Sequence, residues 1–346
     1  MRILAIMMVL ALLLAVPAQA SEIAAPPVPD SGKELMPEKA DSFGEGLWEI
    51  CKDAIGLFRP DLAEACNVCL AVIGSVLLVS LLGSFPGMTK DVADLTGTVA
   101  VAVVLLAGTK SLVHLGSQTV SQISEYGKLL LPVMTAALAA QGGITASAAL
   151  HSGTAVFNAI LSTLISKLLV PMIYLFLALA AANSAIGEDL LKKIRDFIKW
   201  LMVWCLKTIL YIFTGYMGIT GVVSGTTDAA TLKAAKLTIS GAVPVVGGIL
   251  SDASEAILVS AGMVKNAAGI YGILAILAVF AGPFIRIGVH YLLVKMTAAI
   301  CNIFGSKRMT GLIEDFSAAM GLLLAMTGSV CLLLLISTVC FLKGVG

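Results

Sequence analysis

The chain has 346 residues, of which 59% are apolar and only 12% are charged, and its mean hydropathy is +1.01. A soluble domain carries about 25% charged residues, so a chain of this composition lacks the polar surface that it would need in water. Its apolar runs of about 20 residues are typical of membrane-spanning helices. The composition therefore predicts an all-α, polytopic integral membrane protein. The formal net charge of +1 excludes a strongly basic nucleic-acid-binding surface.

Residues 1–20 have the form of a secretory signal peptide. Arg2 supplies the positive start, Ile3 to Val16 form the apolar core, and Ala18-Gln19-Ala20 is a small-x-small cleavage site. An uncleaved membrane anchor is the alternative, but a short apolar core that ends at Pro17 favours cleavage. Cleavage predicts that the mature N-terminus lies outside the cytoplasm.

Residues 21–64 are expected to form an extracytoplasmic tail and an amphipathic helix. The first part, up to Asp41, is rich in Pro, Ala, Glu and Lys, a composition typical of a flexible tail. From Phe43 onwards apolar residues recur at helical spacing, which predicts a helix lying along the membrane surface and ended by Pro60.

Residues 65–346 are expected to form the multi-span membrane domain. The segment 129–166 is divided by Pro132 and Gly142-Gly143, and either a re-entrant pair or two surface helices would fit it. The other apolar runs predict about seven spans, within a range of six to eight. These runs are 65–85, 95–115, 168–187, 200–223, 267–285, 287–304 and 316–341.

Basic residues predict the orientation of these spans. Lys192, Lys193, Arg195 and Lys199 cluster after the third span, so this loop is expected in the cytoplasm. A count from the cleaved signal peptide gives the same side. The same count places Lys307-Arg308 outside, against the positive-inside rule, unless 287–304 does not cross fully.

Thr238–Glu255 is the least regular apolar stretch, and it predicts a helix, a break and a second helix. Pro244 lacks the N–H of a helix interior, and Gly241, Gly247 and Gly248 add backbone freedom. These four residues are the predicted structural break. It fits either non-helical backbone at membrane depth, shielded by protein or water, or a loop at the membrane surface.

No catalytic, cofactor-binding or metal-ligating residues are predicted, because the sequence has no Walker loop, no H-E-x-x-H and no G-x-S-x-G. Asp252 and Glu255 share one helical face and could be paired carboxylates, although helix capping by Ser251 or Asp252 explains them better. Cys66-Asn67-Val68-Cys69 has the spacing of a redox or metal pair, but no second pair accompanies it. Seven cysteines leave at least one free or paired with another chain.

Four basic residues interrupt apolar sequence with no acidic residue within a helical turn: Lys167, Lys207, Arg286 and Lys295. A charge at the bilayer centre costs about 2.5–3.5 kcal/mol on insertion scales. Snorkelling accounts for Lys167 and Lys207, which stand near span ends. Arg286 and His290 lie on one helical face, and we predict that this face meets water or a partner chain.

Three strings resemble a known family. They are Thr214–Gly221, Ser240–Glu255 with its Gly-Ala-Val-Pro-Val-Val-Gly-Gly core, and Gly282-Pro283-Phe284 before Arg286. Together they are similar to the stage III sporulation protein AE family. The likeness is dense from Lys207 to Phe304 and thin before Leu129.

This resemblance implies a multi-pass protein of the mother-cell membrane that surrounds the forespore in an endospore-forming bacterium. Its implied partners are the other stage III sporulation proteins, AA to AH, and through them stage II sporulation protein Q. Together these proteins resemble a secretion-like channel. No catalytic residue and no cofactor come with the family, so we expect a protein that is not an enzyme.

Two other classes of protein remain as alternatives. A secondary transporter or permease would use broken helices at a midplane site, often in two related halves. The sequence shows one such break and no convincing second copy. A membrane enzyme would need clustered polar groups at matched depth, and the sequence shows none.

Overall fold

The computed structural model describes residues 26–37, 43–56, 58–83, 90–187, 189–242 and 247–343, and within these ranges it leaves the side chains of 58–61, 90–91, 189 and 221–265 undescribed. The predicted signal peptide and the tail up to residue 25 lie outside the described residues, so cleavage stays a prediction. All regular secondary structure in the described ranges is helical, which confirms the all-α prediction.

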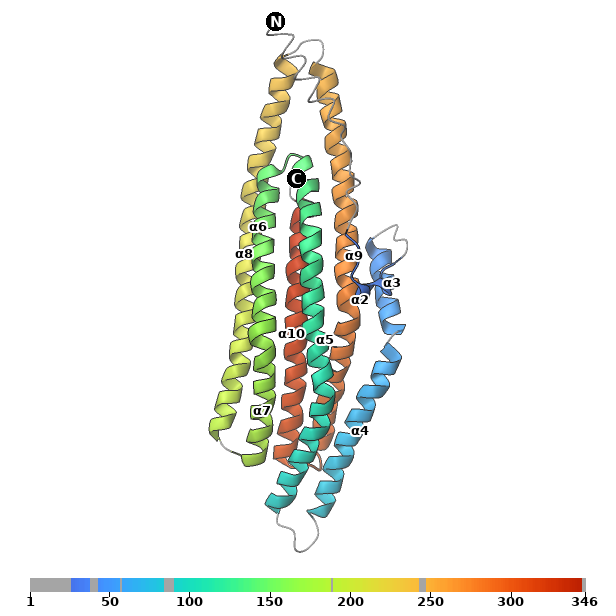
Figure 1. The fold of residues 1–346 in the computed structure, drawn as a ribbon, viewed down its shortest axis with the longest axis vertical. Coiled ribbons are helices and arrows are strands. Elements are labelled where there is room, and N and C mark those ends of the chain that lie inside the picture. Colours follow the sequence, from blue (N-terminus) through green and yellow to red (C-terminus); the bar gives the residue numbers. More distant parts are fainter. Residues whose placement is uncertain are drawn as a thin grey trace.

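The helices are long and lie side by side as an elongated bundle (Figure 1). The first two, α2 and α3, are short, and η1 is a π-helical turn that joins α6 to α7 without interruption. The bounds are α2 Asp30–Lys33, α3 Phe43–Gly56, α4 Phe58–Leu82, α5 Lys90–Ala140, α6 Ile144–Leu164, η1 Ile165–Leu169, α7 Val170–Ile186, α8 Asp189–Ala242, α9 Gly247–Cys301 and α10 Lys307–Lys343.

Six helices of the described chain are long and apolar enough to cross a membrane. They are α4, α5, the continuous α6–η1–α7 rod, α8, α9 and α10. The number lies within the predicted range of six to eight. The expectation of seven is corrected because the predicted spans 267–285 and 287–304 form one helix, α9, with Pro283 inside it. Packed neighbours can accommodate a proline in a membrane helix.

The segment 129–166 forms neither a re-entrant pair nor two surface helices. Its first part is the end of α5, which continues through Lys110, His114 and Pro132, and its second part belongs to α6. The predicted division at Gly142-Gly143 is correct. Gly142 has a positive φ of 92°, a conformation that favours glycine, and it turns the chain between α5 and α6.

α10 forms the centre of the bundle and packs against α5, α6, α7, α8 and α9 (Figure 1). Small residues allow the helices to approach closely, as is usual in membrane bundles. A Cβ atom added to Gly127 would come within 2.8 Å of Leu334, and one added to Gly272 would come equally close to Leu130. Glycines therefore lie at close contacts between helices in the described part of the bundle.

Buried polar groups also join helices that are distant in sequence. The hydroxyl groups of Thr154 on α6 and Ser337 on α10 lie 2.5 Å apart. The Asn158 amide donates a hydrogen bond to the backbone carbonyl of Ser124, at 3.0 Å. In an apolar bundle such bonds satisfy groups that would otherwise be costly to bury.

The amphipathic helix α3 uses its apolar stripe against another helix. Ile50 and Ala54 are buried with Leu274 and Ala278 of α9. The expected helix lying on the membrane surface is therefore replaced by one packed along α9, because α9 offers a complementary apolar face. Pro60 does not end this helix either, since it lies in the first turn of α4, where proline is tolerated.

Candidate functional site

Basic residues gather at the end of the bundle where α7 meets α8 and α9 meets α10, the lower end in Figure 1. Lys192, Lys193 and Arg195 lie in the first turns of α8, and Lys307 and Arg308 begin α10. The positive-inside rule assigns this end to the cytoplasm. Because α9 crosses once, all of these residues lie at the same end, and the conflict raised by Lys307-Arg308 disappears.

A second level of charged residues lies farther along the bundle. Each member stands 15 to 20 residues from the cytoplasmic end of its own helix, which corresponds to about 23–30 Å at 1.5 Å per residue. This distance is close to the roughly 30 Å thickness of a bilayer's hydrocarbon core. The second level is therefore expected near the outer boundary of the membrane. Its members are Glu64, Lys110, Lys167, Lys207 and Arg286.

The structure separates the two residues predicted to share a partner- or water-facing surface. Arg286 lies at the outer level and forms an ion pair with Glu64 of α4, with 3.1 Å between Nη2 and Oε2. His290 is only 6% exposed, and its Nδ1 lies 2.9 Å from the backbone carbonyl oxygen of Arg286. Beside His290 is a cavity of about 20 Å³, which has room for a single water. A partner-facing role stays a prediction for Arg286.

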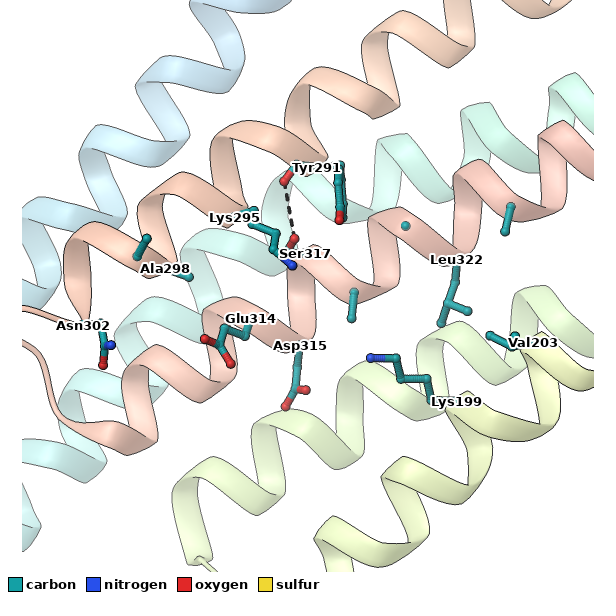
Figure 2. Close-up of a pocket in the computed structure, with 14 residues that line it drawn as sticks. Lys199, Val203, Tyr291, Lys295, Ala298, Asn302, Glu314, Asp315, Ser317 and Leu322 are labelled. Atoms are coloured by element: carbon teal, nitrogen blue, oxygen red, sulfur yellow. Dashed lines mark hydrogen bonds between the residues drawn. The ribbon is translucent and has the colours of Figure 1, made fainter.

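A charged hollow of about 690 Å³ opens between α8, α9 and α10 (Figure 2). Lys199 reaches it from α8, Lys295 from α9, and Glu314 and Asp315 from α10. Lys295 lies six residues before the end of α9, and Asp315 eight residues after the start of α10. These charges are therefore about 9–12 Å inside the cytoplasmic ends of their helices. They lie at the depth of the cytoplasmic leaflet, on the apolar side of the basic end.

An ion pair closes one side of this hollow. Arg195 Nη1 and Asp315 Oδ2 lie 2.5 Å apart, and the two side chains are only 12% and 14% exposed. Arg195 also contacts Asp196, at 2.8 Å. The pair ties α8 to α10, so the hollow has a fixed charged wall. Across it, Lys295 Nζ lies 5.9 Å from the centre of the Tyr291 ring, near enough for a cation–π contact.

Small residues of α10 line the hollow between these charges. Ala318, Gly321 and Ala325 follow one another along α10 at helical spacing. The Ser317 hydroxyl donates a hydrogen bond to the Tyr291 carbonyl, at 3.4 Å, and holds α9 against α10 at this place (Figure 2). The hollow thus combines charged walls with a small-residue floor. It can hold water, ions or a polar segment of another chain.

Sequence reasoning missed this site. It assigned Lys199 to a cytoplasmic loop, noted Lys295 only as an unpaired charge, and did not single out Glu314 or Asp315. The sequence did contain a signal for this site. Three apolar helices, α8, α9 and α10, each carry a charged residue at a similar distance from the cytoplasmic end of the helix. Within the described residues, no group of three or more His, Cys, Asp or Glu side chains is placed to hold a metal ion.

The predicted break lies at the opposite end of the bundle from the basic residues. α8 ends at Ala242 and α9 begins at Gly247, while Pro244 lies outside the described residues. Each of these helices is about 80 Å long, so their hairpin extends roughly 50 Å beyond the outer level of charge (Figure 1). This places the break away from membrane depth. Asp252 is not an N-cap, because α9 begins five residues earlier; the functional importance of the break stays a prediction.

The fold and these sites define a multi-pass α-helical membrane protein with a charged hollow at one membrane face. A family model described as Stage III sporulation protein AE matches residues 44–344. The chain therefore belongs to the stage III sporulation protein AE family, and family membership implies a role in stage III of sporulation. The description of the family names no enzymatic activity.

A relative named "Stage III sporulation protein AE", from Bacillus subtilis (strain 168), is 23% identical over 193 residues. The match covers 56% of this chain and 48% of the relative, so it spans about half of the relative's length. No solved structure matches the chain.

Proposed function

We propose that this chain is a membrane subunit of a secretion-like channel complex that links mother cell and forespore and that endospore formation requires. The proposed location is the mother-cell membrane around the forespore. The proposed partners are the stage III sporulation proteins AA to AH and, indirectly, stage II sporulation protein Q. Family membership supports a role in stage III sporulation. The charged hollow is the observation that carries the more specific proposal.

The hollow supports a role in an assembly because, among the described residues, most of its charged side chains form no ion pair. Within the described residues, ion pairs engage Asp315 but not Lys199, Lys295 or Glu314. Charges at the depth of a membrane leaflet are costly unless they face water or pair with another chain. A conduit supplies water, and a neighbouring subunit supplies pairing. Both conditions are met in a channel complex.

The length of the α8–α9 hairpin also supports the proposal. The hairpin continues well beyond the thickness that a bilayer needs. In the proposed orientation it projects from the mother-cell membrane into the space between the two membranes. A projection of this kind gives the subunit a way to meet components of the complex in that space.

A secondary transporter or permease is the second candidate, and the same hollow favours it in one respect. Ionisable residues that line a cavity within a membrane are typical of substrate pathways. A transporter needs only this chain and a small solute. A channel subunit needs its partner chains, and an experiment can separate the two.

The test is affinity capture of the tagged chain from sporulating cells, with identification of bound chains and a spore count. The hollow variant is Lys199→Gln/Lys295→Gln; both side chains are exposed, so the variant is expected to accumulate normally. We expect the wild type to recover other stage III sporulation proteins. The hollow variant should recover several-fold less and form fewer spores.

The matched control is Lys193→Gln/Lys343→Gln, which removes two positive charges outside the hollow. It should behave as the wild type. Recovery of no stage III sporulation protein by the wild type, together with solute uptake by vesicles that contain the purified chain alone, would favour the transporter. If both double variants had the same effect on partner recovery and spore count, the charges of the hollow would have no specific role in assembly.

A further inference from the structure

A second, smaller hollow lies at the cytoplasmic end of the bundle, between the α7–α8 turn and the start of α10. Its volume is about 210 Å³. Four basic side chains from two helices line it: Lys192 and Arg195 of α8, and Lys307 and Arg308 of α10. The remaining lining residues are Asn183, Ser184, Gly187 and Gly311, so no acidic residue is among them.

Most of the positive charge in this hollow is not neutralised. Arg195 pairs with Asp315 and Asp196. In the described part of the chain, no ion pair engages Lys192, Lys307 or Arg308. The side chains of the acidic residues Glu188 and Asp189 lie outside that part. The lining residues alone leave three cationic groups around one small space.

The start of α10 adds to this positive potential. A helix N-terminus carries about half a positive charge and favours acidic residues in its first turn. α10 begins instead with Lys307 and Arg308 and has no acidic residue in its first turn. Ser306 accepts a hydrogen bond from the backbone N–H of Met309, at 3.4 Å, which is a partial cap without charge. An anion in the hollow would offset both the basic side chains and the helix terminus.

Glycine shapes the hollow for a compact group. Gly187 ends α7 with a φ of 79°, and the Arg308 guanidinium lies against it. A Cβ at Gly187 would be in van der Waals contact with Arg308 Nη2, at 3.4 Å, and the positive φ favours glycine at this position. The available volume suits a phosphate group with its ester oxygens. It is too small for a folded partner.

The depth of the hollow points to lipid as the source of that phosphate. On the exposed side of α8, Phe197, Trp200 and Trp204 form a stacked series, with ring centres 5.9 and 6.1 Å apart. Aromatic side chains of this kind mark the interface between headgroups and acyl chains. Lys192 lies on the cytoplasmic side of this series, at the level expected for headgroups.

We propose that this hollow binds the phosphate of an anionic phospholipid in the cytoplasmic leaflet. Basic pockets between membrane helices on the cytoplasmic side bind such headgroups in other proteins. The lipid would hold α7, α8 and α10 together at their cytoplasmic ends. It would also fix the depth of the neighbouring charged hollow, since Arg195 lines the lipid site and pairs with Asp315 in the other wall.

The experiment uses the purified full chain in bilayer discs of phosphatidylcholine with a minor share of phosphatidylglycerol. After extraction into detergent, native mass spectrometry measures the lipid that each protein retains. The wild type should be enriched in phosphatidylglycerol over the starting mixture. A basic side chain next to a bound anionic headgroup contributes about fivefold to its binding. Lys307→Gln/Arg308→Gln should therefore reduce enrichment by about 25-fold, and the exposed Lys192→Gln by about fivefold.

The matched control is Lys193→Gln/Lys199→Gln, which removes two charges from the same end but outside this hollow. It should keep the enrichment of the wild type. Equal loss in the control, or no enrichment in the wild type because Glu188 and Asp189 neutralise the site, would overturn the proposal. Displacement of phosphatidylglycerol by millimolar inorganic phosphate would assign the site to free phosphate and overturn the lipid assignment. Circular dichroism establishes that each variant is folded, and Lys192→Gln provides the test if the double variant is not.

Discussion

Among the described residues, two ion pairs join helices that are distant in sequence, and the exposure of their side chains determines what each contributes to stability. Arg195–Asp315 joins α8 to α10 with both side chains almost buried. Arg286–Glu64 joins α9 to α4 with side chains 34% and 52% exposed. Removing one partner of a buried pair leaves an uncompensated charge, whereas solvent screens an exposed pair. The first pair is therefore structural, and the second is expected to contribute little to stability.

We predict that Asp315→Asn lowers the free energy of unfolding by about 3 kcal/mol, because the almost buried Arg195 loses its buried countercharge and keeps only the half-exposed Asp196. Glu64→Gln, which breaks the exposed pair, should cost less than about 1 kcal/mol. Denaturant unfolding of the purified chains, followed by circular dichroism, measures both. Similar losses of unfolding free energy in the two variants would show that burial does not determine how much each ion pair stabilises the protein.

A second prediction concerns Gly153, over which the Tyr216 ring lies. A Cβ at Gly153 would overlap the ring, so Gly153→Ala should displace Tyr216 and break its hydrogen bond to the Ala149 carbonyl, which is 3.0 Å long. Overpacking of this kind costs about 1–3 kcal/mol. Gly74→Ala is the control, since an added Cβ there meets open space. The midpoints of thermal unfolding should fall for the first variant and not for the second.

At the scale of elements, sequence reasoning succeeded where local signals act alone. The end of α7 near Gly187 and the turn at Gly142-Gly143 follow from backbone conformations that favour glycine. The predicted divisions at Pro132 and at Arg286 were wrong, because packing against neighbouring helices keeps α5 and α9 continuous at these positions. No local pattern reports such packing, and the predicted span count was too high for this reason.

The candidate site was less predictable than the helices. Arg286 and Glu64 are 222 residues apart, and Arg195 and Asp315 are 120 residues apart, so no helical-spacing argument could pair them. Helical spacing places Arg286 and His290 on one face, and the predicted contact of that face with water or a partner stays a prediction. The surroundings of this face depend on α4 and α5, which bury His290 and leave Arg286 at the edge.

The α8–α9 hairpin allows a test of the predicted break. Replacing Pro244, Gly247 and Gly248 with Ala favours continuous helix, since Pro costs about 3 kcal/mol and Gly about 1 kcal/mol relative to Ala. α8 and α9 run in opposite directions along the bundle and converge at its upper end, so the chain reverses between them (Figure 1). A straight continuation competes with this hairpin. We expect increased protease cleavage between α8 and α9 and a lower spore count.

The control for this variant is Gly215→Ala/Gly218→Ala. It adds helix propensity within α8 at positions where a Cβ meets open space. Its protease sensitivity and spore count should equal those of the wild type. If the triple variant also matched the wild type in both measurements, the stretch would be a simple connector.

At the scale of the whole molecule, two levels of charge define how the bundle sits in a membrane. The basic ends and the outer level, about 30 Å apart, enclose the segment that lipid must cover. The rest of α5, α6, α8, α9 and α10 then extends from one face only. Some apolar side chains beyond the outer level remain exposed, among them Ile144, Tyr211 and Ile219.

This arrangement predicts which residues a membrane-impermeant thiol reagent can reach in intact protoplasts. Lys193→Cys in α8 and Ile303→Cys in the α9–α10 turn should both be protected, because six crossings place them at the cytoplasmic end. Ile144→Cys at the start of α6 should react. All three side chains are exposed in the structure, so burial does not explain protection. The test uses a background in which Cys51, Cys66 and Cys69 are replaced, and permeabilised cells should label at all three positions.

Ile303 is the decisive site, because a seventh span within α9 would place it outside. Labelling of Ile303→Cys in intact protoplasts, with Lys193→Cys protected, would restore the seven-span topology and separate Lys307-Arg308 from the basic end of α8.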